Sequence, residues 1–221
     1  KNNKLTLGSW ITFGDPAIAE IMAKVGFDWL TVDLEHSAIS IDQMQQLIRV
    51  IELCGVSPLV RVSENSTVYI KRAMDAGAHG VIVPMVNTKE DAERAVSAVK
   101  YPAQGTRGVG LGRAQGYGMS FEKYKKWVRD ESVVIVQIEH IDAINNLEAI
   151  LSVDGVDGSM IGPYDLSGSL GYPGEFERKE VKEALTRYEK IGKKIGKSRV
   201  LKKNFHQTLS LFLVEISDKL T

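Results

Sequence analysis

The feature that most constrains the fold of this 221-residue chain is a regular alternation of short apolar segments with amphipathic segments. The apolar segments are rich in Val and Ile, which is typical of strands in a parallel sheet covered on both faces. Strand–helix alternation of this kind predicts βαβ units. The predicted strands are Leu7–Phe13, Trp29–Leu34, Pro58–Val62, Gly80–Pro84, Val133–Ile138 and Val156–Ile161. The predicted helices are Pro16–Val25, Ile41–Cys54, Thr67–Ala76, Lys89–Val99, Glu122–Arg129, Ala143–Leu151 and Glu175–Lys194.

Two architectures share this pattern, an open doubly wound sheet and a closed (β/α)8 barrel. The open fold usually carries a glycine-rich phosphate loop after its first strand, whereas here the first strand runs into Gly14-Asp15-Pro16. Six sequential units without a long central crossover favour the barrel. We therefore predict a single (β/α)8 TIM-barrel domain over residues 1–221, with strands seven and eight atypical or incomplete in a divergent tail at 195–221. The chain is short for that fold, which typically has about 250 residues.

Composition excludes several classes of protein. The 28 Lys+Arg residues balance the 28 Asp+Glu residues, so a nucleic-acid partner is not indicated. A hydrophobic content of 43% is that of a globular chain and not of a disordered one. No apolar run approaches the ~20 residues of a membrane span. A single cysteine, Cys54, and the absence of a signal-peptide pattern at Lys1–Lys4 lead us to expect a reducing, cytoplasmic location.

Chemically active side chains follow the predicted strands at their carboxyl ends, where the active sites of barrels lie. Asp33 and His36 follow the second strand and Arg61 lies in the third. Glu139 follows the fifth strand and Asp165 follows the sixth. Each has a structural explanation when taken alone, such as an N-cap or a structural ion pair. Four strands that deliver such residues to one rim make a purely structural explanation much weaker.

The residue types suggest roles. Glu139 and Asp165 are candidate metal ligands, because two carboxylates with water and a chelating substrate suit Mg²⁺, Mn²⁺ or a similar ion. Asp33 can hold the His36 imidazole in one tautomer and raise its basicity, which makes His36 a candidate general base. The planar fork of Arg61 matches a carboxylate and predicts an acidic substrate. None of the predicted strands contains Lys, which argues against an imine mechanism and favours metal-assisted chemistry.

One further segment is unusual in composition. Gly105–Gly118 is dense in glycine, but it does not follow a Val/Ile strand, so it does not match a nucleotide-binding loop. We interpret it as a mobile active-site loop. His79 precedes a strand at the opposite rim, and we interpret it as structural.

Six segments, taken in order, carry a resemblance to a known family. They are Asp28–His36, Pro58–Val62, Gly80–Val86, Arg107–Gly110, Val136–Glu139 and Ile161–Ser167. From about Leu7 to Lys194 the sequence resembles the HpcH/HpaI aldolase family, metal-dependent class II pyruvate aldolases of the 4-hydroxy-2-oxoheptanedioate aldolase type. The resemblance implies a homo-oligomer, typically a hexamer built from dimers with exchanged C-terminal helices.

The resemblance also implies roles for single residues. Glu139 and Asp165 match the family's metal ligands, and His36 matches the base with Asp33 as its partner. Arg61 matches the residue that holds the 2-oxo acid end of the substrate. Positions whose roles rest on the resemblance alone are Asp75, linked to active-site polarity, and the pyruvate-pocket residues Gln137, Gly162, Pro163 and Tyr164.

The expected reaction is the reversible cleavage of a 4-hydroxy-2-oxo acid to pyruvate and an aldehyde, with Mg²⁺, Mn²⁺ or Co²⁺ as cofactor. Two alternatives stay open. The scaffold could condense a 2-oxo acid with an acyl donor in a biosynthetic pathway. It could also be a catalytically impaired barrel with a truncated C-terminus, although the intact His36, Arg61, Glu139 and Asp165 speak against loss of the site.

Overall fold

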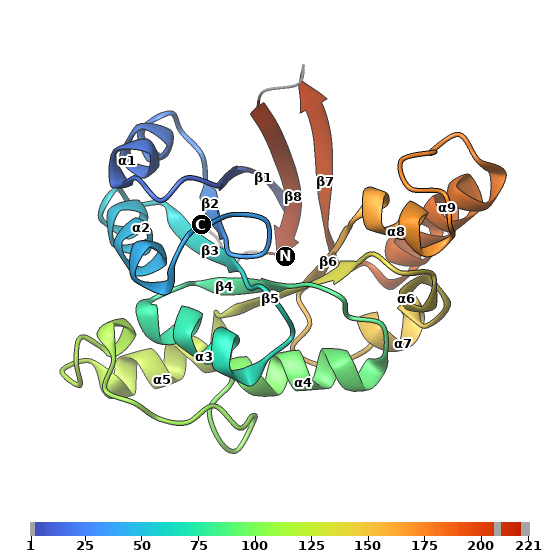
Figure 1. Ribbon diagram of the computed structural model, residues 1–221. Coiled ribbons are helices and arrows are strands. Elements are labelled where there is room, and N and C mark those ends of the chain that lie inside the picture. The colour runs from blue at the N-terminus through green and yellow to red at the C-terminus, as the bar shows by residue number, and fades with distance from the viewer. Residues whose placement is uncertain (1–2, 206–208, 218–221) are drawn as a thin grey trace.

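The computed structural model of the protein describes residues 3–205 and 209–217, and the side chains of residues 6–197. In this part of the chain, the first six strands form a curled, all-parallel half-barrel with helices packed around its outside (Figure 1). The strands are β1 (Asn3–Ile11), β2 (Trp29–Asp33), β3 (Ser57–Arg61), β4 (Gly80–Val83), β5 (Val133–Ile138), β6 (Gly158–Ile161), β7 (Ser198–Phe205) and β8 (Leu209–Ser217). The helices are α1 (Pro16–Lys24), α2 (Ile41–Leu53), α3 (Thr67–Ala76), α4 (Lys89–Val99), α5 (Phe121–Asp130), α6 (Ile141–Asn145), α7 (Leu147–Leu151), α8 (Pro163–Ser169) and α9 (Lys179–Ile195), with a 3-10 turn, η1, at Arg113–Gln115.

The predicted (β/α)8 barrel is wrong. β7 pairs in parallel with β6, but β8 runs antiparallel both to β7 and to β1. The ring of eight strands is therefore closed by an antiparallel hairpin and not by two further βα units (Figure 1). The physical reason is the length of the connection. Only residues 206–208 separate β7 from β8, whereas a crossover between parallel strands needs about a dozen residues.

Local sequence signals set the ends of the helices. α1 begins with Pro16 after the N-cap Asp15, whose carboxylate accepts the Ala17 N–H at 2.9 Å. α2 begins with a capping box in which Ser40 and Gln43 satisfy each other's backbone N–H groups. α3 ends at Gly77, whose φ of +107° is the left-handed conformation that glycine adopts without strain. The strands β1 to β7 that these helices connect pair in parallel, so their carboxyl ends share one rim.

Alternation along the strands sorts their side chains into two layers. Outward side chains such as Leu30, Val60 and Val134 join the large core beneath the helices. Because the inward parity continues to the strand ends, polar residues there face the barrel axis. The interior below them is filled by Trp29, Leu59, Ile82, Val133, Ile135 and Met160.

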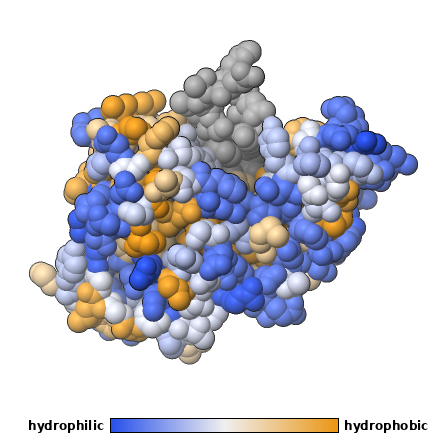
Figure 2. All heavy atoms as spheres, viewed as in Figure 1, coloured by the Kyte–Doolittle hydropathy of each residue, from blue (hydrophilic) through white to orange (hydrophobic). Residues whose placement is uncertain are grey.

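The outer surface carries both polar and apolar side chains. Within the described residues, no helix is both long and apolar enough to cross a membrane. On the face shown in Figure 2, apolar residues gather over α1, where the side chains of Ile21 and Val25 are 65% and 71% exposed. Cys54, at the end of α2, is half-buried and free. None of these three side chains is part of the fully buried core.

Candidate active site

Strand ends bring several predicted site residues together at the carboxyl rim. Asp33 and Arg61 are register partners on the neighbouring strands β2 and β3. Glu139 directly follows β5, and Gly162 directly follows β6. The Gly162 N–H donates to the Ile138 carbonyl at 2.9 Å, which ties the ends of β5 and β6 together. These residues form one cluster although up to 129 positions separate them in sequence, as between Asp33 and Gly162.

Arg61 is clamped at this rim. Its Nε donates to Asp33 Oδ1 at 2.8 Å and its Nη2 donates to Asp33 Oδ2 at 2.6 Å, a bidentate pair. Its Nη1 lies 3.0 Å from Glu35 Oε2, and its guanidinium lies 4.5 Å from the centre of the Trp10 ring. The side chains of Arg61 and Asp33 are only 12% and 3% exposed. A guanidinium held on three sides is a fixed point of positive charge.

Asp33 also organises the turn that carries His36. Asp33 Oδ1 accepts the backbone N–H groups of Glu35 at 3.0 Å and of His36 at 3.3 Å. The carboxylate within ion-pair range of the imidazole is that of Glu35, with Oε2 3.9 Å from His36 Nε2. The His36 side chain is 63% exposed. The predicted role of Asp33 as the partner of the imidazole stays a prediction, and its contact with the His36 backbone is what the structure records.

Glu35 is the rim residue that sequence reasoning missed. Besides Arg61 and His36, its Oε2 accepts from Gln137 Nε2 at 3.4 Å, so one carboxylate contacts three predicted site residues. Burial raises the pKa of Glu35; the Arg61 guanidinium opposes this rise, and the negative charge of Glu139 adds to it. The available signal was its place two residues after Asp33, which in an extended segment puts both side chains on one face.

Glu139 is the most buried carboxylate beside β6. It is 2% exposed, its Oε1 accepts the Met85 N–H at 2.6 Å, and its Oε2 accepts from Gln137 Nε2. Burial raises the pKa of Glu139, the hydrogen bonds from Gln137 and Met85 oppose the rise, and Asp165 adds to it. Met85 has φ +52°, uncommon for a residue with a side chain and a kind of strain found at functional sites.

Gly162 leaves a space between the two candidate metal ligands. A Cβ at Gly162 would lie 3.0 Å from Glu139 Oε2 and 3.7 Å from Asp165 Oδ2. The two carboxylates therefore flank one small volume that glycine keeps open. Beside it, Gln137 Oε1 is buried and has no hydrogen-bond partner in the described part of the chain. Hard oxygen atoms around an open space form the donor set that Mg²⁺ or Mn²⁺ prefers.

The charge balance of the rim also favours a bound cation. Asp33, Glu35, Glu139 and Asp165 contribute carboxylates, and the Arg61 guanidinium pairs with two of them, Asp33 and Glu35. Uncompensated negative charge is costly when buried. Among the described residues, no three His, Cys, Asp or Glu side chains are arranged around one metal position. A cation held by Glu139 and Asp165 would therefore complete its shell with water or substrate oxygens.

Comparison with known proteins identifies the family. The family model for HpcH/HpaI aldolase/citrate lyase matches residues 6–202. The chain belongs to this family. A hydroxypyruvate/pyruvate aldolase from Sagittula stellata is 43% identical over 180 residues, which cover 81% of this chain and 71% of that protein. The chain is accordingly an enzyme, a carbon–carbon lyase.

Solved structures agree. A HpcH/HpaI aldolase/citrate lyase family protein from Burkholderia cenocepacia J2315 superposes with a TM-score of 0.82 at 33% identity, covering 87% of this chain and 77% of that one. The citrate synthase SbnG superposes with a TM-score of 0.77 at 29% identity, covering 87% of this chain and 75% of that one. Reactions of more than one kind therefore occur on this scaffold.

Four residues assigned by the HpcH/HpaI resemblance lie at the start of α8: Gly162, Pro163, Tyr164 and Asp165. Pro163 is the first residue of α8, and Gly162 is its N-cap. The Tyr164 side chain is 64% exposed, and its ring packs edge-on against Phe176 with 4.9 Å between centroids. Asp165 lies in the first turn of the same helix. The backbone of this turn, and not the Tyr164 ring, is what lies next to Glu139.

Asp75 is not brought to the carboxyl rim of its own chain. It lies in the last turn of α3, at the amino ends of the strands, where its backbone oxygen would be 3.1 Å from a Cβ at Gly112. The glycine-dense segment lies at the same end, because Arg113 donates to the Ala76 carbonyl at 2.9 Å. The interpretation of that segment as an active-site loop is therefore wrong for the rim of the same chain.

Proposed function

We propose that the protein is a class II aldolase that reversibly cleaves a 4-hydroxy-2-oxo acid to pyruvate and an aldehyde. The observation that carries the proposal is the pair of carboxylates, Glu139 and Asp165, that flank the open space at Gly162 on the same rim as the clamped Arg61. The name of the Sagittula relative supports pyruvate or hydroxypyruvate as the 2-oxo acid.

In this proposal, Glu139 and Asp165 hold a divalent cation such as Mg²⁺, Mn²⁺ or Co²⁺. The fit rests on their hard oxygen donors, on the excess of carboxylates at the rim and on the space left by Gly162. When bound, the cation supplies positive charge beside the 2-oxo group of the substrate. The remaining chemistry belongs to side chains of the rim.

Arg61 binds and orients the 2-oxo acid end of the substrate. Its fork is fixed by Asp33 and Glu35 before the substrate arrives, so little rotamer freedom is lost on binding. A fixed positive charge also stabilises negative charge that develops on the oxo oxygen. The resemblance adds Gln137 as a lining residue and the turn at Gly162, Pro163 and Tyr164 as the backbone around the carboxylate of pyruvate.

His36 acts as the general base in this proposal. It removes the proton of the C4 hydroxyl while the C3–C4 bond breaks and the aldehyde leaves. The electron pair of that bond stays with the pyruvate fragment, whose C3 then takes up a proton. The exposed imidazole can exchange its proton with water, and Asp33 holds the turn on which His36 stands.

Release of pyruvate from a synthetic 4-hydroxy-2-oxo acid tests the proposal. Chelation should abolish the activity, and Mn²⁺ should restore it. Glu139→Gln should lower kcat/KM at least ~100-fold, since charge stabilisation at the oxo oxygen is lost. The exposed Glu131→Gln is the matched control. A full aldolase rate in Glu139→Gln with excess Mn²⁺ would remove the metal assignment.

A second candidate is the condensation of a 2-oxo acid with an acyl donor. It is favoured by the likeness to the citrate synthase SbnG at 29% identity. The same rim would serve, because both reactions need a stabilised enolate. Thiol release from oxaloacetate and acetyl-CoA, measured beside the pyruvate assay, distinguishes the two reactions.

Four expectations reach beyond this rim and stay predictions. A homo-oligomer, hexameric or dimer-based, and a role for Asp75 rest on the family resemblance. A cytoplasmic location rests on the single Cys54. A single domain over 1–221 with a divergent tail at 195–221 rests on the even composition of the chain.

A further inference from the structure

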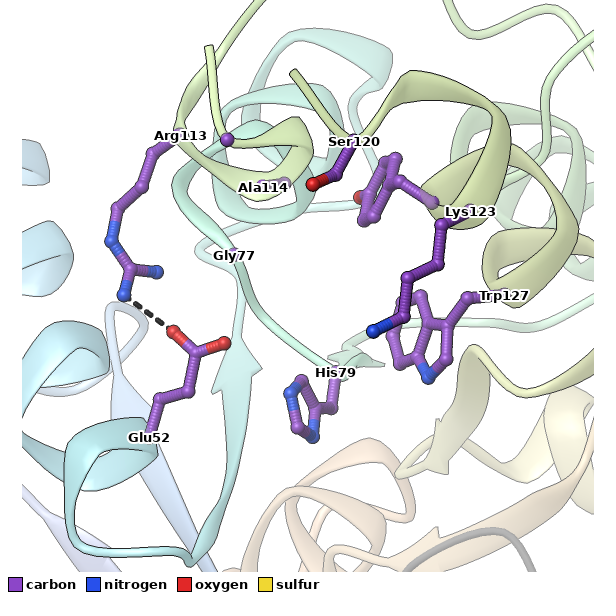
Figure 3. Close-up of a pocket in the computed structure, with 10 residues that line it drawn as sticks. Glu52, Gly77, His79, Arg113, Ala114, Ser120, Lys123 and Trp127 are labelled. Carbon is purple, nitrogen blue, oxygen red and sulfur yellow. Dashed lines mark hydrogen bonds and ion pairs between the residues drawn. The ribbon is translucent and has the colours of Figure 1, made fainter. Parts of the chain in front are cut away.

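A cavity lies at the amino ends of the strands, opposite the carboxyl rim. Its volume is ≈ 410 Å³, within the range that small organic ligands occupy. It opens between the end of α2, the α3–β4 connection, η1 and α5 (Figure 3). Its lining residues are Glu52, Gly77, His79, Arg113, Ala114, Gly116, Ser120, Lys123, Tyr124 and Trp127.

One wall of this cavity is a fixed ion pair. Arg113 Nη2 pairs with Glu52 Oε2, and Arg113 Nη1 donates to the Ala76 carbonyl at 2.9 Å. Gly77 makes this arrangement possible, since a Cβ there would lie 2.3 Å from Arg113 Nη1. The positive charge of Arg113 is thus already balanced by Glu52, and this wall carries no net charge.

The facing wall is aromatic. The rings of His79 and Trp127 lie 5.2 Å apart and tilted, and Trp127 stacks on Tyr124 with 5.7 Å between centroids. The Tyr124 hydroxyl is engaged in donating to the Met74 carbonyl at 3.1 Å. This wall therefore offers flat apolar surface to a planar ligand.

Two polar groups at the cavity have no hydrogen-bond or ion-pair partner within the described residues. The Lys123 ammonium points into the cavity beside the Trp127 ring in Figure 3 and forms no ion pair with that part of the chain. The His79 imidazole forms no hydrogen bond there, and burial lowers its pKa, with Glu52 opposing and Arg113 reinforcing the shift. A neutral imidazole offers one donor and one acceptor. The cavity thus presents one unbalanced positive charge next to an aromatic surface.

We propose that this cavity binds small aromatic carboxylates, with the ring against Trp127 and His79 and the carboxylate at the Lys123 ammonium. Such a ligand balances the charge of Lys123 and covers the aromatic wall in one step. The cavity and the carboxyl rim lie at opposite ends of the strands, so the inference does not depend on the aldolase activity.

Calorimetric titration of the full chain with benzoate tests the proposal. Binding should be saturable, while acetate, which lacks the ring, and benzyl alcohol, which lacks the charge, should each bind at least ~10-fold more weakly. Lys123→Met should weaken benzoate binding by roughly 10-fold, the usual size of one charge-assisted hydrogen bond. Lys126→Met is the matched control, since Lys126 is an exposed lysine of the same helix, like Lys123, but does not line the cavity.

Two further variants locate the site. Trp127→Leu should weaken benzoate binding, with circular dichroism confirming the fold, and Trp127→Phe should retain part of it. Arg61→Gln, at the carboxyl rim, should leave benzoate affinity unchanged. Absence of saturable binding, as expected if a second copy of the chain fills the cavity, would overturn the proposal. So would equal affinities in Lys123→Met and Lys126→Met, or loss of binding in Arg61→Gln.

Discussion

At the scale of single residues, the rim is organised by shared carboxylates. The Asp33 carboxylate pairs with the Nε and Nη2 edge of the Arg61 guanidinium and accepts two backbone N–H groups. The Glu35 carboxylate pairs with Arg61 Nη1 and also accepts a hydrogen bond from Gln137. Each of these acids thus fixes several groups at once. A substitution at one of them is expected to disturb the geometry of the others more than the stability of the fold.

Glu35→Gln should lower kcat/KM for pyruvate formation by about 10- to 100-fold, because a misplaced orienting group costs that much. The amide keeps the shape of the side chain but removes the charge facing Arg61 and His36. Steady-state kinetics beside a thermal melt measure the two effects separately. The exposed Glu64→Gln is the matched control, and unchanged kinetics in Glu35→Gln would show that Arg61 is positioned without it.

His79 should make stability depend on pH. Its pKa is lowered in the folded protein by burial, so the unfolded chain takes up the proton first as the pH falls through about 6.5. Protonation then favours unfolding, an effect that nearby Glu52 opposes and Arg113 reinforces. Urea denaturation at pH 7.5 and pH 5.5 should show wild type losing more stability than His79→Gln. An equal loss in both proteins would contradict this assignment.

At the scale of elements, strand parity decides which residues share a surface. Trp29, Leu59 and Ile135 fill the barrel interior, and the next inward positions on their strands are polar. Gly8 on β1 makes room for this interior, since a Cβ there would lie 2.0 Å from the Trp29 ring. The packing of the Trp29 indole thus favours glycine at position 8 of the neighbouring strand.

Gly8→Ala should lower the free energy of unfolding by about 1–3 kcal/mol, the usual cost of overpacking. Gly108→Ala is the matched control, because a Cβ at Gly108 would meet nothing within 4 Å. Urea unfolding of both variants measures the difference. A stability of Gly8→Ala equal to that of Gly108→Ala would mean that Trp29 can move aside at little cost.

The sequence anticipated the parts of this architecture that depend on local chemistry. The predicted helix starts at Pro16 and Ile41 are confirmed, and the strands that end near Asp33 and Glu139 could be recognised from their apolar runs. The contacts of Glu35 could not be predicted from the sequence, because they depend on the register of β2 against β3. The direction of the strand Leu209–Ser217 could not be predicted either, since an apolar run does not encode which neighbour it pairs with.

At the scale of the whole molecule, closure depends on β8. This strand pairs with β1 on one side and β7 on the other, and Leu213 is opposite Leu7 and Leu201. The strands β1 to β7 run parallel to one another, so β8 alone joins the two edges of this parallel sheet. Disrupting β8 should therefore open the ring without touching the β2–β6 segment.

Leu213→Pro should lower the free energy of unfolding by about 1–3 kcal/mol, because proline removes one ladder hydrogen bond and leaves its acceptor unpaired. Hydrogen exchange should speed up in β1 and β7 and stay slow in β4 and β5. Leu213→Val keeps the N–H and serves as the control. Uniformly faster exchange in all strands would show that the ring opens only by global unfolding.

The reversed direction of β8 also decides where the chain leaves the molecule. Ser217 is the register partner of Asn3, at the amino end of β1, whereas a parallel eighth strand would finish at the carboxyl rim. The strand β8 therefore ends on the face opposite the candidate active site. We expect an affinity tag, a reporter domain or a surface-immobilisation linker added after this strand to leave the proposed aldolase activity unchanged.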